Sequence, residues 1–186
     1  EGVLAESGEA SADGTVYTVK LRPGITSSFG NEFTADDVVW GWERAFARRD
    51  VGKWVAIIGS VTGPQDVVAL DRHTVEFRLR APNPTLLQQL TRQTPVIHDS
   101  VAAREHATDA DPWATEWLTR PPAGFGAYSL DSLTPWGEAV LVANAGAPHP
   151  PAIERIRVRF VPGARERRQL LVDGEVDLLP DIAPDE

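Results

Sequence analysis

The residues FTADDVVWGWERA, at positions 33–45, form the most informative stretch of the chain. Thr34 stands three residues before Asp37, which is the spacing of a helix N-terminal cap, and the acids Asp36 and Asp37 suit the positive end of a helix dipole. Apolar residues then recur every three or four positions, at Ala35, Val38, Val39, Trp42, Ala45 and Phe46. This rhythm predicts a helix that begins after Thr34 and buries one stripe of side chains.

Trp40 belongs to this predicted helix but points about 140° away from the apolar stripe, because successive residues turn by about 100°. We expect it to make a second packing contact, so that the helix is buried on two sides. The alternative is an exposed Trp40 within an apolar patch that binds another protein.

Strand patterns lie on both sides of the helix. Residues 15–22 alternate, with Tyr17, Val19 and Leu21 on one face, which predicts a half-buried strand. Residues 66–70 and 74–79 predict a hairpin around the polar turn 71–73. A short helix is expected after Pro84, and its buried face would consist of Leu86, Leu87 and Leu90.

The rest of the chain predicts short elements in mixed order. Helices are expected near 99–106, 112–118 and 164–173, strands at 127–134, 138–143 and 154–161, and an extended path at 176–178. Gly174 is placed to stop the last helix. The fold class is therefore α+β, or mixed α/β, rather than a regular series of βαβ units.

Composition excludes several classes of protein. The 186 residues carry 18 basic and 27 acidic side chains, a net charge of −9, so nucleic acid is not an expected partner. Without cysteine there can be no disulfide, thiolate metal site or cysteine nucleophile. No apolar run approaches the roughly 20 residues of a membrane span. Because the chain has no methionine and begins at Glu1 without a signal peptide, we expect an excised piece of a longer protein.

Candidate groups for chemistry are few. His98 and His106 lie eight positions apart, with Asp99 and Glu105 beside them, and could be assembled into a metal site. Zinc ligands are usually spaced more tightly, so we expect surface residues at the ends of a helix instead. The sequence contains neither the Gly-x-Ser-x-Gly pattern of a nucleophile elbow nor a phosphate-binding P-loop.

Four stretches, in order, resemble the bacterial extracellular solute-binding proteins of family 5, the receptors of ABC importers for peptides, nickel and some sugars. They are LAES at 4–7 with YTVKLRPG at 17–24, FTADDVVWGWERA at 33–45, DRHTVEFRL at 71–79 with APNP at 81–84, and PAGFGAY at 122–128 with LLVDGEVD at 170–177. One departure is AGAPHP at 145–150, where the family has an aromatic turn. The resemblance covers nearly the whole chain.

The resemblance implies a fragment of a type II periplasmic-binding-protein-like fold. Residues 1–120 would form the accessory subdomain of the first lobe, and residues 121–186 part of the main sheet of that lobe. Two such lobes close about a hinge on a ligand held between them. Family position points to Trp54, Gln93 and Thr94 as the residues here that touch ligand.

The same resemblance implies the binding partners and the cellular location of the protein, and it implies that the protein is not an enzyme. The ligand would be a peptide or another small solute, delivered to ABC permease subunits in the membrane by an extracytoplasmic protein or lipoprotein. No cofactor and no metal are expected. Nickel chelates and oligosaccharides stay open as ligands, and a metal-dependent hydrolase using His98 and His106 is the alternative of another class.

Overall fold

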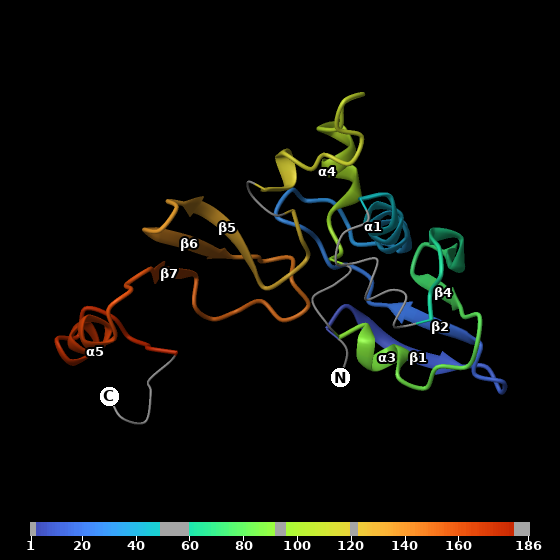
Figure 1. The fold of residues 1–186 in the computed structure, drawn as a ribbon, viewed down its shortest axis with the longest axis horizontal. Coiled ribbons are helices and arrows are strands. Elements are labelled where there is room, and N and C mark those ends of the chain that lie inside the picture. Colours follow the sequence, from blue (N-terminus) through green and yellow to red (C-terminus); the bar gives the residue numbers. More distant parts are fainter. Residues whose placement is uncertain (1–2, 49–59, 92–95, 120–122, 181–186) are drawn as a thin grey trace.

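The computed structural model describes residues 3–48, 60–91, 96–119 and 123–180. Two parts lie side by side along the longest axis (Figure 1). One part contains a four-stranded sheet with most of the helices, and the other contains a three-stranded sheet followed by the last helix. None of the helices in the described part of the chain has the length and apolar character that a bilayer span requires.

The four-stranded sheet is antiparallel and has the order β1-β2-β4-β3. Its strands are β1 (Ala5–Ala10), β2 (Val16–Leu21), β3 (Val67–Asp71) and β4 (Thr74–Arg78). The predicted alternation is confirmed, because Tyr17, Val19 and Leu21 are buried, and Tyr17 and Val19 lie opposite Phe77 and Val75. The predicted hairpin is confirmed as well, with a turn at residues 72–73.

Strand β1 is a feature that the sequence analysis did not predict. It pairs with β2 along one edge, and all its residues after Ala5 are exposed. Glu6 and Glu9 belong to this outer strand, and the register with β2 shifts between Ala5 and Ser7. An edge strand buries little, so it needs few of the apolar residues that signal a strand.

Helix α1 (Ala35–Arg48) is buried on two sides, as expected. Val38 and Trp42 belong to the main core, where Trp42 meets Phe77 edge-on with ring centroids 5.5 Å apart. Trp40 belongs to a second core cluster with the small residues Ala103, Ala114 and Ala123 and with Leu118. Trp40 is 3% exposed, so the alternative of an exposed patch around it is wrong.

The shorter helices differ in part from expectation. Helices α3 (Leu86–Gln89) and α4 (Ser100–Glu105) occupy predicted positions, and a 3-10 turn η1 (Pro64–Asp66) precedes β3. Of the predicted leucine face only Leu86 is fully buried, while Leu87 is 38% exposed. The helix predicted at 112–118 is wrong, because only the 3-10 turn η2 (Trp117–Thr119) forms and Ala114 has a φ of 47°. Trp113 and Trp117 nevertheless pack against the second cluster.

The second sheet is an antiparallel meander, β5-β6-β7. It comprises β5 (Tyr128–Leu133), β6 (Glu138–Ala143) and β7 (Arg155–Arg159), and α5 (Ala164–Val172) follows. Gly174, with a φ of 71°, ends α5 as predicted. No strand forms at 176–178 within the described residues. Leu133 and Val158 on this sheet are more than half exposed, and α5 has no buried residue.

Candidate functional site

The residues predicted to touch ligand, Trp54, Gln93 and Thr94, lie outside the described residues. Their surroundings can still be examined from the residues on either side. The described chain stops at Thr91 and resumes at Val96 around the second of these segments. Thr91 and Ile97, which lie on either side of that gap in the sequence, both line a cavity.

The cavity has a volume of about 660 Å³ and lies between the first two strands, α1 and α3. Most of its lining is apolar, including Leu4, Val19, Trp42, Leu87 and Ile97. Glu6 is the one ionisable side chain among the described residues that line the cavity. This volume is in the range of about 300–1,000 Å³ that small-molecule sites occupy, but catalysis needs titratable groups that converge, which this lining does not provide.

Asp99 has both carboxylate oxygens occupied by hydrogen bonds from the protein. Its Oδ2 accepts the Ser27 hydroxyl at 2.5 Å, its Oδ1 accepts the backbone N–H of Ala102 at 2.9 Å, and the Asn31 amide donates to both oxygens at 3.1 and 3.2 Å. The expectation that Asp99 is a surface residue is wrong, because its exposed fraction is 0%. It caps α4 and holds the loop of residues 27–31 against that helix.

His98 is also buried, with 8% of its surface exposed, which corrects the same expectation. Its ring meets Trp40 edge-on at 6.3 Å, and its Nδ1 has no hydrogen-bond partner among the described residues. Burial, together with the nearby charge of Arg44, lowers the pKa of His98 to about 4. The imidazole is therefore neutral near pH 7 and packs against Trp40 of the second core cluster.

The two histidines do not converge on a common point. The His106 ring stacks on Trp117 with centroids 4.2 Å apart, and its Nδ1 lies 2.9 Å from the carbonyl oxygen of Ala102. His98 faces Trp40 instead. No group of three or more metal-ligating side chains comes together within the described ranges. The arrangement provides side chains for packing and none of the geometry of a metal centre.

Comparison with known proteins supplies what the geometry leaves open. The family described as "Bacterial extracellular solute-binding proteins, family 5 Middle" matches residues 1–186. The chain belongs to this family. This family 5 chain is 30% identical over 194 residues to "Peptide transport periplasmic protein SapA" of Salmonella typhimurium (strain LT2), covering 95% of the chain and 34% of the relative. It is 27% identical over 180 residues to "Glutathione-binding protein GsiB" of Escherichia coli (strain K12), covering 94% and 32%.

Solved structures give the same fold. The family 5 chain resembles the periplasmic binding protein DppA of Helicobacter pylori in complex with the peptide STSA, with a TM-score of 0.80, 26% identity and coverage of 95% of this chain and 37% of that one. It also resembles MoaA of A. tumefaciens R10 in complex with mannopinic acid, with a TM-score of 0.79, 30% identity and coverage of 95% and 34%. The family 5 chain thus spans about a third of the length of these relatives.

Proposed function

We propose that this chain is part of the first lobe of a receptor that captures peptides outside the cytoplasm and delivers them to an ABC permease. The likeness to DppA with its bound peptide carries the proposal, since it extends over 95% of the chain at a TM-score of 0.80. SapA is named for peptide transport, GsiB for glutathione binding, and a 35% identical Lactococcus lactis relative for dipeptide binding.

The geometry supports a binding role over an enzymatic one. Among the described ionisable side chains, Asp99 is tied into a helix cap and His98 is buried against Trp40. The apolar cavity can hold a nonpolar group, but its described lining residues offer no pair of acid and base to act on it. A receptor needs only a shaped, partly preformed surface, and it completes ligand burial when its second lobe closes.

The two parts of the structure correspond to two subdomains in this proposal. Residues 1–120 form the accessory subdomain and residues 121–186 a portion of the main sheet of the lobe. Exposed apolar residues on the second sheet, such as Leu133 at 57% and Val158 at 51%, support this division, because they suit a sheet that further chain covers.

Ligand contacts are proposed for Trp54, Gln93 and Thr94. An indole face can lie along a peptide backbone, and the polar pair can exchange hydrogen bonds with it. In this proposal the apolar cavity lined by Thr91 and Ile97 receives an apolar side chain of the same ligand. An extracytoplasmic location, by export or lipid anchorage, completes the proposal.

Isothermal titration calorimetry on the natural-length protein tests the ligand class. Dipeptides, longer peptides, nickel–histidine, oligosaccharides and mannopinic acid serve as separate titrants. We expect saturable heat with peptides and a weaker response in Trp54→Ala. Trp136→Ala is the matched control, because Trp136 is 82% exposed at the β5–β6 turn. If saturable heat comes only from the sugar, the opine or the nickel titrant, the ligand belongs to that class of solute and not to peptides.

A further inference from the structure

Two remote segments of the chain meet at Asn144, directly after β6. The Asn144 side-chain amide donates to the carbonyl oxygens of Thr26 at 2.9 Å and Gly126 at 3.1 Å. Its Oδ1 accepts the backbone N–H of Gly146 at 3.0 Å, and its own backbone N–H donates to Ala127 at 2.8 Å. Asn144 is 6% exposed, and its side-chain hydrogen bonds are part-buried.

The contact is reciprocal and close. The Thr26 N–H donates to the carbonyl oxygen of Gly146 at 2.9 Å, so Thr26 is held through both of its backbone polar groups. A Cβ atom at Gly146 would overlap the Thr26 hydroxyl and lie 2.8 Å from the Thr26 carbonyl oxygen. Only glycine permits this approach of the two backbones.

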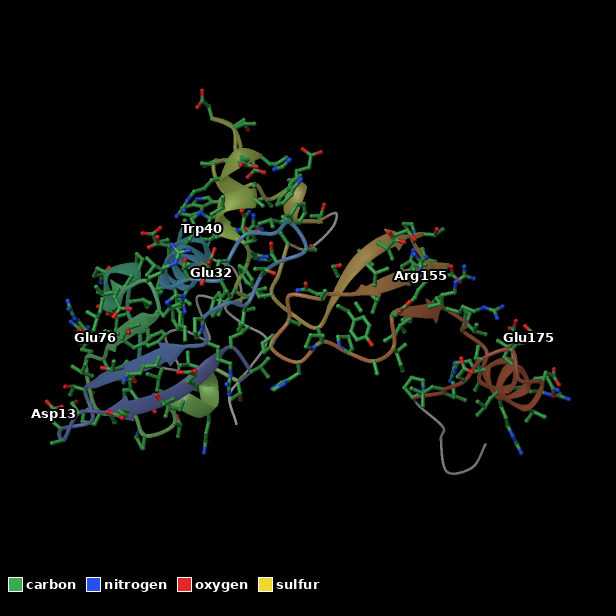
Figure 2. The ribbon with its side chains drawn as sticks, turned by 180° about the vertical axis from the view of Figure 1, so that it is seen from behind. Asp13, Glu32, Trp40, Glu76, Arg155 and Glu175 are labelled. Carbon is green, nitrogen blue, oxygen red and sulfur yellow. The ribbon has the colours of Figure 1, made fainter. Side chains whose placement is uncertain are left out.

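The Thr26 loop is in turn fixed to the helices. Ser27, the next residue, donates to Asp99, and the ring of Phe33 at the end of the loop packs at a tilt against that of Phe125, with centroids 5.0 Å apart. Phe125 immediately precedes the crossing into the second sheet. The two parts seen in Figure 2, one with Trp40 and Glu32 and the other with Arg155 and Glu175, are therefore joined by the chain at 126–127 and again by Asn144.

We propose that Asn144 is the positioning residue that locks the accessory subdomain to the main sheet, so that the first lobe moves as one body during ligand capture. The capture step rests on the proposed function, but the lock is a property of the unliganded lobe. A covalent crossing alone would act as a hinge, because two adjacent backbone residues can absorb a large rotation. The second, hydrogen-bonded crossing removes that freedom.

A spin-label distance measurement on the natural-length protein, without ligand, tests the lock. The chain contributes no cysteine, so Ala12→Cys and Ser132→Cys place one label in each part once any cysteine outside residues 1–186 is replaced by serine. We expect one narrow distance distribution. Asn144→Asp replaces the amide donor by a carboxylate oxygen that faces two carbonyl oxygens, and we expect it to widen the distribution.

Asn83→Ala is the matched control. Asn83 also bridges loops, and its side-chain bonds to Ser60 and Thr85 join described parts of the accessory subdomain, so we expect its loss to lower the melting temperature without widening the distribution. If Asn144→Asp does not fold, Gly146→Ala gives the same test by forcing Thr26 away. A distribution that is broad in the unchanged protein, or that stays narrow in a folded variant at either position, overturns the proposal. If calorimetry detects no heat of peptide binding, peptide capture is refuted. The spin-label result on the junction at Asn144 would still hold, because it is measured without ligand.

Discussion

The carboxylate of Asp37 accepts the backbone N–H of Ser100 at 2.8 Å, and thereby joins the beginnings of two helices. Its other oxygen accepts the backbone N–H of Thr34 at 2.8 Å, as the capping pattern predicts. One buried acid thus satisfies donors in front of α1 and at the first residue of α4.

Replacing Asp37 by alanine is expected to lower the free energy of unfolding by about 2–4 kcal/mol, because a cap is lost and a buried N–H is left without a partner. Asp36→Ala is the control, since Asp36 is exposed on the same helical turn and its loss is expected to cost less than about 1 kcal/mol. Urea denaturation of both variants measures the difference. Equal losses would show that the bond to Ser100 contributes nothing.

Two tryptophans are expected to respond very differently to truncation. Trp40→Ala removes the largest side chain of the second core cluster and should cost about 3–5 kcal/mol. Trp136→Ala, at a site that is 82% exposed, should change stability by less than about 1 kcal/mol. Thermal melting compares them directly. If the Trp40 variant has the same melting temperature as the unchanged protein, the assignment of Trp40 to a core is contradicted.

His98 is expected to make the protein less stable in mild acid. Because its pKa falls from 6.5 to about 4 on folding, the unfolded chain binds more protons between these values, and stability decreases as pH falls through this window. The full effect is on the order of 3 kcal/mol.

His98→Gln removes the titrating group and should flatten the dependence of stability on pH between about 6.5 and 4. The half-buried acid Glu32 titrates mostly below this window, since hydrogen bonding with Arg72 first, then Gly24 and His73, lowers its pKa to about 2. Its contribution is lost only as pH falls from 4.5 toward 2. If the stability of the His98→Gln variant decreases from neutral pH to pH 4 as steeply as that of the unchanged protein, the role of His98 is refuted.

Zinc is expected to leave the melting temperature unchanged. A metal that binds only the folded state must raise it, but Asp99 has both oxygens bonded and His98 and His106 face different aromatic rings. Titration with Zn²⁺ during thermal melting measures this. A saturable rise that His106→Ala abolishes would revive the hydrolase alternative.

Elements with a strong local signal were predictable from sequence. Helix α1, the β3–β4 hairpin and the stop at Gly174 each follow from patterns within a few residues. The helix predicted at 112–118 does not form, which shows where local patterns are insufficient. The carboxylate of Asp111 accepts the backbone N–H of Glu116 at 2.9 Å and closes a loop there instead. Periodic tryptophans indicated burial there but not helical backbone.

The buried polar sites were not predictable, because their partners are remote in sequence. Asp99 and His98 have the appearance of helix-end surface residues until Ser27, Asn31 and Trp40 are brought against them. The junction at Asn144 likewise depends on Thr26, 118 positions earlier. For the ligand-contacting residues, family resemblance suggested positions, and their roles stay predictions.

Strand β1 has a consequence for how copies of this protein behave toward one another. Its outer edge has no pairing strand among the described residues, yet it carries Glu6 and Glu9 and a shifted register. Two copies that met along this edge would bring like charges together on an irregular backbone, so strand addition between them is unfavourable. We expect the two glutamates on this outer strand to disfavour the growth of a continuous sheet through copies of the chain.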